Sequence, residues 1–192
     1  MRASSKLNRL TVYAQYSVRK LVNDIGGFAA VEFAMVVPIM IMMLLGSVEV
    51  SDALTVDGRI NIVASSISDI VARSSPIKKA DLKDIFKFSH VLIGRYDHAS
   101  VKTEVVSLIP DPVTGVMTVD WSYNSDGGAP YTRGSTYPGF WDGMAPKDNS
   151  LIITKTKFKY RSPIGQYLHG DITLSHLSNN VSRSVAIVCS DC

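Results

Sequence analysis

The chain has 192 residues, 46% of them apolar and 19% charged, and a formal net charge of +3. Its length suffices for one ordinary domain with an appendage. Residues 1–27 hold five basic side chains and one acidic side chain, a balance of +4 that leaves about −1 for the rest of a +3 chain. Beyond residue 27 there is no stripe of Lys and Arg with interleaved aromatic residues, which argues against nucleic acid as a partner.

Residues 28–48 form an apolar run in which Glu32 is the only charged side chain. A helix of this length spans roughly 31 Å, close to the hydrocarbon thickness of a bilayer. A buried core helix of this length usually has a polar face, and Val36 to Leu45 has none. An ordinary secretory signal has a shorter apolar region, an A-x-A site after it and no Glu inside it. The sequence therefore predicts a transmembrane helix.

The charges on either side of this run predict its orientation. Basic residues precede it, and the first acidic residues, Glu49, Asp52 and Asp57, follow it. Because cytoplasmic flanks are enriched in Lys and Arg, residues 1–27 are expected to form a basic cytoplasmic leader. Everything after about residue 50 is expected outside, which in a bacterium is the periplasm. The expected location is the bacterial inner membrane, crossed once.

The stretch "GGFAAVE", Gly26 to Glu32, sits at the start of the apolar run. A carboxylate at the centre of a membrane helix costs about 2.5–3.5 kcal/mol, but Glu32 lies only about 6 Å along the axis from Phe28 and can stay near the interface. One interpretation is a shallow carboxylate that reaches headgroups. The other is a partner for a positive charge nearby, such as the α-amine that a cut between Gly27 and Phe28 would create.

This order of a basic leader, Gly27, Phe28, Glu32 and a charge-free span resembles the processing site of type IV prepilins and pseudopilins. The resemblance implies cleavage by an inner-membrane prepilin peptidase between Gly27 and Phe28. It also implies that Glu32 pairs with the α-amine of a neighbouring subunit during assembly. A Gly suits the position before the cut because it fits a narrow peptidase cleft and resists continuing the helix.

The longer stretch "GGFAAVEFAMVVPIMIMMLLGSVEV" is similar to the N-terminal motif of TadE-like proteins of the tight-adherence (Flp) pilus system. The matching residues are Ala30 to Ala34, Pro38, Gly46 and Glu49. The resemblance implies a minor pilin or pseudopilin with a pilin-like plan, because the major Flp pilin is a far shorter chain. It also implies partners in a second Tad pseudopilin and other pilus-assembly proteins.

Residues 49–75 are expected to continue the span as an amphipathic helix. Apolar residues recur at spacings of four and three, which is helical periodicity: Val56, Ile60, Val63, Ile67 and Ile70. This stripe fits either a coiled coil with a partner or packing on the chain's own sheet, and the second is favoured. A short second helix is expected over Ala80–Phe88, with Leu82, Ile85 and Phe86 on one side.

The remainder of the 76–192 region is expected to form strands. Two β-rich runs flank the turn-forming residues 110–115, which predicts a hairpin. In the second run Met117, Val119, Trp121 and Tyr123 are expected on one buried face. Further strands are expected over Ser150–Tyr160, Asp171–Leu174 and Ser184–Cys189. Helix followed by antiparallel sheet predicts an α+β periplasmic domain.

The segment Asn124–Ser150 is rich in Gly, Pro, Asn and Asp and is expected to be a long loop. Its four large aromatic residues either contact a partner or cover the edge of the core: Tyr131, Tyr137, Phe140 and Trp141.

The sequence offers little catalytic chemistry. The four His residues, at positions 90, 98, 169 and 176, are scattered without metal-ligand spacing, and no nucleophile or phosphate-binding motif occurs. We therefore expect no enzyme activity, catalytic residue, cofactor, metal or small-molecule substrate. Cys189 and Cys192, the only cysteines, are expected to form a local disulfide that stabilises little, because the loop is so short. Pairing between chains and free thiols are the alternatives.

Two functions follow as hypotheses. The first is a minor pilin or pseudopilin that helps to assemble or prime a Flp-type pilus through protein–protein contacts. The alternative is an uncleaved single-pass anchor for a periplasmic module that binds an envelope ligand through the aromatic loop.

Overall fold

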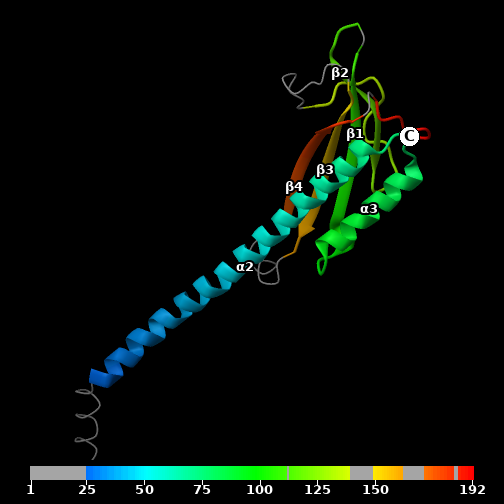
Figure 1. The fold of residues 1–192 in the computed structure, drawn as a ribbon. Helices are drawn as coiled ribbons and strands as arrows, with labels where there is room; N and C mark the ends of the chain where they lie inside the picture. Colours follow the sequence, from blue (N-terminus) through cyan, green and yellow to red (C-terminus); the bar gives the residue numbers. More distant parts are fainter. Residues whose placement is uncertain (1–24, 112, 139–148, 162–170, 184–185) are drawn as a thin grey trace, which may run out of the picture. The chain divides into compact units, whose positions relative to one another are not determined.

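The computed structural model describes residues 25–111, 113–138, 149–161, 171–183 and 186–192. Two helices come first, α2 (Ile25–Arg73) and α3 (Lys79–Ile93), and a short 3-10 turn, η1 (His98–Ser100), follows. Four strands complete the chain: β1 (Val101–Pro110), β2 (Met117–Asn124), β3 (Leu151–Tyr160) and β4 (Ile172–Val181) (Figure 1). The expected α+β plan, an apolar N-terminal helix followed by an antiparallel sheet, is confirmed.

The chain divides into two units, residues 1–48 and residues 49–192. In the first unit the described residues are helical, and Phe28 to Val48 expose most of their side chains. The helix Gly27–Arg73 is long and apolar enough to cross a membrane by length and composition. One N-terminal candidate span is therefore shown. The transmembrane helix was expected to begin at residue 28, after the leader of residues 1–27, and α2 begins at Ile25 and runs through both glycines. A Gly weakens a helix by about 1 kcal/mol but does not by itself end one.

The second unit is built on a sheet with strand order β2-β1-β3-β4 and antiparallel neighbours throughout. Residues 49–73 of α2 and all of α3 supply apolar side chains to a core on one face of this sheet. α3 is longer than expected at its C-terminal end, where Ile93 is also buried. A cis peptide bond joins Ser75 to Pro76 in the linker between the helices.

The helical stripe packs on the chain's own sheet. Val56, Ile60, Val63 and Ile67 are all fully buried in this core, which confirms the favoured interpretation. Burying each such side chain contributes on the order of 1.5–3 kcal/mol. Ile70 is only half-buried, and Val71 continues the buried stripe instead.

The strand β2 departs from the expected alternation. Its register with β1 shifts by one residue, so that Trp121 lies opposite Ser107 while Val119 lies opposite Leu108. A bulge of this kind switches the side chains beyond it to the other face of the sheet. Met117 and Val119 consequently belong to a second apolar cluster, away from Trp121 and Tyr123 in the helix-covered core. The prediction of one buried face for all four residues was wrong.

The long loop covers this second cluster. Tyr137 is buried in the cluster and Tyr131 packs against it, with ring centroids 5.1 Å apart. Ser135 and Gly134 exchange backbone hydrogen bonds with Val119, which covers that part of the free edge of β2. These two tyrosines therefore cover the edge of the core. Phe140 and Trp141 lie outside the described residues.

The structure also differs from the expectation for the last two strands. The strand expected over residues 171–174 extends to Val181, and β4 pairs along the whole of β3. The segment expected as a strand over residues 184–189 forms only an isolated parallel bridge, Cys189 with Ile77. Its backbone groups bond to the linker between the helices and to side chains, so a regular ladder does not form. Residues 184 and 185 lie outside the described part of the chain.

Candidate functional site

The residues expected at the processing site share one helix. Gly27, Phe28 and Glu32 all lie in the first two turns of α2 and are exposed, Phe28 at 74%. A Cβ placed on Gly27 would meet no atom within 4 Å. Within the described residues, Glu32 makes no hydrogen bond or ion pair. The three residues are thus available to another molecule. The leader residues 1–24 lie outside the described part.

A carboxylate just beyond the apolar run organises the start of the second unit. Asp52 Oδ1 accepts hydrogen bonds from Arg95 Nη2 at 2.6 Å and from the Tyr96 hydroxyl at 2.8 Å. Asp52 Oδ2 accepts one from the Tyr160 hydroxyl at 3.1 Å. Arg95 also lies over the Tyr96 ring, 5.2 Å from its centroid. We call these four residues the Asp52 cluster. It ties α2 to the segment after α3 and to the end of β3.

The surroundings of the cluster lower the pKa of Asp52 and raise the pKa of Tyr160. The hydrogen bond from Tyr96 holds the pKa of Asp52 below its ordinary value of 3.8, helped by Tyr160 and Arg95 and opposed by burial. Burial, and then the hydrogen bond to Asp52, raises the pKa of Tyr160 to about 12. A carboxylate that accepts three hydrogen bonds is stabilised in its charged form. The cluster thus holds an ionised Asp52 beside a neutral Tyr160 phenol at neutral pH, which suits a structural tie.

Two other charged residues of α2 are also held within the second unit. Asp57 Oδ1 lies 2.8 Å from His176 Nε2 on β4. Arg59 Nη1 donates to the carbonyl of Ile93 at 3.1 Å and lies over the Tyr96 ring. Asp57 was expected as a topology signal after the span, and its partner His176 lies too far along the chain to be read from spacing.

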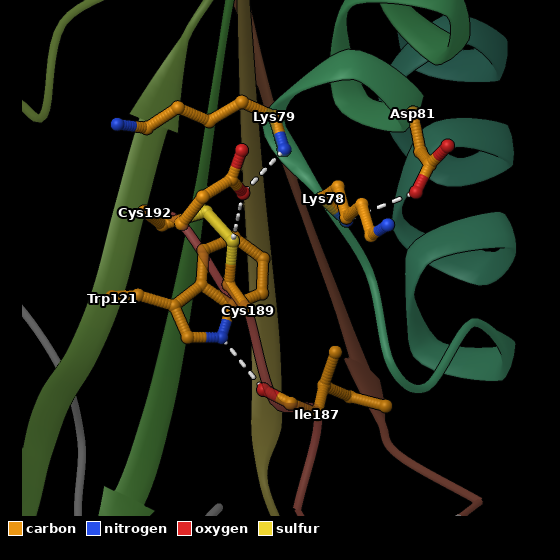
Figure 2. The surroundings of a disulfide bond; sticks show 8 residues. Lys78, Lys79, Asp81, Trp121, Ile187, Cys189 and Cys192 are labelled. Carbon is orange, nitrogen blue, oxygen red and sulfur yellow. Dashed lines mark hydrogen bonds between the residues drawn. A yellow bond between two sulfur atoms is a disulfide. The ribbon is translucent and has the colours of Figure 1, made fainter.

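The structure also shows what the other His and Cys residues contact. The rings of His90 and His98 meet edge-on with centroids 5.0 Å apart, and His169 lies outside the described residues. Cys189 and Cys192 form a disulfide (Figure 2). With Asp191 they make the one grouping of potential metal ligands found among the described residues. A metal binds thiolate sulfur, so the disulfide removes two of these three ligands.

Comparison with protein families identifies the N-terminal segment. Residues 27–67 match the family model of TadE-like proteins. The expected resemblance is confirmed over this TadE-like segment, which is about a fifth of the chain. The match shows a likeness to TadE-like proteins over these residues alone. Comparison with curated proteins and with solved structures gave no match.

The TadE-like segment contains Gly27, Phe28, Glu32, the Asp52 position and most of the buried stripe of α2. The sheet, α3 and the C-terminal segment lie outside it. The family match therefore covers the candidate span and most of the helical stretch that packs against the sheet. It does not cover the sheet.

Proposed function

We propose that this chain is a minor pilin or pseudopilin that takes part in assembling or priming a Flp-type pilus through protein–protein contacts. The observation that carries the proposal is the exposed set Gly27, Phe28 and Glu32 on one helix inside the TadE-like segment, with Glu32 the only charged side chain of residues 28–48. The family is not known for enzymes. In this proposal the N-terminus is cytoplasmic, the chain crosses the inner membrane once, and the second unit is periplasmic.

Cleavage between Gly27 and Phe28 by a prepilin peptidase is the first step of the proposal. It would remove the basic leader and leave an α-amine on Phe28, one helical turn from Glu32. Glu32 of one subunit would then pair with the α-amine of a neighbour. A charge pair inside lipid is favourable only when both partners are present, which gives the pairing its selectivity.

Intact-mass analysis of the full chain tests the cleavage. We expect protein from cells that contain the Tad peptidase to begin at Phe28, and protein from cells that lack it to keep residues 1–27. Gly27→Leu should keep the leader in both strains, because a branched side chain blocks the peptidase cleft. A chain that still begins at Met1 beside an active peptidase rules cleavage out.

The docking role of Glu32 needs a separate measurement. Glu32→Gln and Glu32→Ala should both leave membrane insertion and cleavage intact while pilus output falls. Asp69→Asn is a matched control, because it removes an acid from the same helix where Asp69 only pairs with exposed Arg73. Unchanged pili in both Glu32 variants would favour the alternative, an uncleaved anchor that carries a periplasmic binding module.

A further inference from the structure

The C-terminal segment is joined to the linker between α2 and α3. Ile77 N donates to the Val188 carbonyl at 3.0 Å, and Ser190 N donates to the Ile77 carbonyl at 3.2 Å. Ile187 is fully buried, and its carbonyl accepts a hydrogen bond of 2.7 Å from Trp121 Nε1. Backbone contacts therefore hold the segment in place up to Ser190, and the disulfide acts on Asp191 and Cys192.

One of the two residues enclosed by the disulfide, Asp191, caps a helix. Asp191 Oδ1 accepts a hydrogen bond of 2.8 Å from the backbone N–H of Lys79, the first residue of α3 (Figure 2). The first N–H groups of a helix have no partner inside the helix. The residue before the helix is Lys78, whose ammonium cannot accept a hydrogen bond, and Asp81 serves only the N–H of Lys78. Asp191 supplies the acceptor that Lys78 lacks, and its charge suits the positive end of the helix dipole.

The short disulfide loop explains why this effect is local. Closing a loop of so few residues removes little entropy from the unfolded chain, so the global stabilisation is small. Without the bond, however, the backbone hydrogen bonds of this segment to other described residues would end at Ser190, and only the side chain of Asp191 would contact α3. The bond from Cys192 back to Cys189 turns the chain so that the Asp191 carboxylate stays over α3.

The two sulfurs differ in accessibility. Cys189 is half-buried and bridged to Ile77, whereas Cys192 is exposed. Both border a pocket of about 400 Å³ that is also lined by Trp121, Tyr131 and Arg133. A second protein can thus reach the disulfide from this side, and it reaches Cys192 more easily.

We propose that Cys189 and Cys192 are a site of thiol–disulfide exchange with a Cys-x-x-Cys oxidase, and that closing the disulfide sets the Asp191 cap on α3. The Cys192 thiolate attacks one sulfur of the oxidase disulfide and displaces the other as a thiolate. The Cys189 thiolate then attacks Cys192 Sγ, which forms the intramolecular bond and releases the reduced oxidase. Two electrons pass from this chain to the oxidase. The two protons lost by the thiols of this chain balance those that the oxidase gains as it becomes a dithiol. We take this oxidase to be periplasmic because the second unit is proposed to lie in the periplasm, and this part of the inference rests on the proposed function.

Trapping the mixed disulfide tests the exchange step. The reduced full-length chain in detergent is mixed with a purified bacterial periplasmic Cys-x-x-Cys thiol oxidase, quenched with acid, alkylated and run on a non-reducing gel. Cys189→Ser should accumulate the adduct through Cys192, because this chain then has no second thiol that could attack Cys192 Sγ and complete the oxidation. Cys192→Ser should give little adduct, and the unaltered chain should become oxidised. Equal adducts from both variants, or an unaltered chain that stays reduced, would overturn the assignment.

Hydrogen exchange at the start of α3 tests the cap. Exchange at Lys79 and its neighbouring amides is compared in the oxidised chain, the reduced chain and Asp191→Ala. Loss of a cap should speed exchange at these amides about fivefold, both on reduction and in Asp191→Ala. Ser190→Ala is the control and should exchange like the unaltered chain, because only its backbone bonds to Ile77. If Asp191→Ala speeds exchange and reduction does not, the disulfide does not position the cap. Neither experiment depends on cleavage after Gly27 or on Glu32, so failure here is distinct from failure of the pilin proposal.

Discussion

At the scale of single residues, the Asp52 cluster shows how the charged residues after the apolar run are used. Asp52 keeps 27% of its side chain exposed, and Arg95 keeps 74%. The two tyrosine hydroxyls, rather than the exposed ion pair, are therefore the stronger contacts, because an exposed salt bridge contributes little. The periodicity of α2 predicted that Asp52 lies off the buried stripe. It could not predict the partners, which come from positions 43 to 108 residues away.

Removing one hydroxyl tests this ranking. Tyr160→Phe keeps the buried ring and deletes the hydrogen bond to Asp52, so the free energy of unfolding should fall by about 1–2 kcal/mol. Urea unfolding of the full chain in detergent, followed by circular dichroism, measures the change. Tyr123→Phe is the matched control, because the Tyr123 ring is equally buried and its hydroxyl bonds no described residue. An equal loss in both variants would contradict the proposed role of the Asp52 hydrogen bonds.

The lowered pKa of Asp52 predicts a pH dependence. Because the folded state binds the Asp52 proton less tightly than the unfolded state, the contribution of Asp52 is fully present above about pH 4 and is lost as the pH falls further. Asp97, Asp111 and Asp171 also have lowered pKa values, so the acid loss of stability is shared. Asp52→Asn should therefore be less stable than the unaltered chain at pH 7, and the gap should narrow at pH 3. A gap that is constant with pH would contradict the assignment.

At the scale of elements, sequence periodicity predicted α2 and β3 well, because each buries one regular face. A strand was expected over Ser150–Tyr160, and in β3 every second residue from Ile152 to Tyr160 is buried. It failed for β2, since a bulge adds one residue without any compositional signal and moves Met117 and Val119 to the opposite face. It also failed for the C-terminal segment, whose hydrogen-bond partners belong to a linker more than a hundred residues earlier.

The end of α3 provides a prediction at this scale. Gly94 has a φ of +69°, and a Cβ there would lie 2.8 Å from Arg59 Nη1, which bonds the Ile93 carbonyl. Gly94→Ala should cost about 1–3 kcal/mol for the backbone conformation and about 1 kcal/mol more for the displaced Arg59 hydrogen bond. Gly115→Ala is the control, because Gly115 has a φ of +70° and open space around it. Thermal unfolding of both variants measures the difference, and equal losses would show that Arg59 moves freely.

At the scale of the whole molecule, the division at Glu49 predicts which part folds alone. A fragment of residues 49–192 keeps the α2 residues that enter the core, together with α3 and the sheet. It should be soluble without detergent and should unfold cooperatively. A fragment of residues 74–192 should not fold, because it removes the fully buried stripe of α2 from the core. Calorimetry of the two fragments decides this, and a cooperative transition in the shorter one would contradict the role given to α2.

The family match and the physical contacts inform different parts of the chain. The TadE-like segment ends at residue 67, before α3 and the sheet begin. The apolar run, Glu32 and the glycine pair could be recognised from sequence because they are contiguous. The Asp52 cluster and the Asp191 cap could not, since each forms only when distant segments fold together.

The path of α2 along β3 also sets how the second unit would carry a mechanical load. Asp52 meets Tyr160 near one end of the contact, and the Ser68 hydroxyl donates to the Ile152 carbonyl at 3.4 Å near the other, so the two elements run in opposite directions. Tension applied at Glu49 on α2 and at Ile152, near the end of β3 far from Glu49, therefore loads these contacts together in shear. Pulling at Arg73 and Ile152 would instead load them one after another, as in peeling. Optical-tweezer measurements on residues 49–192 should show a higher unfolding force for the first pair of attachment points than for the second, because in shear the contacts between α2 and β3 must break together.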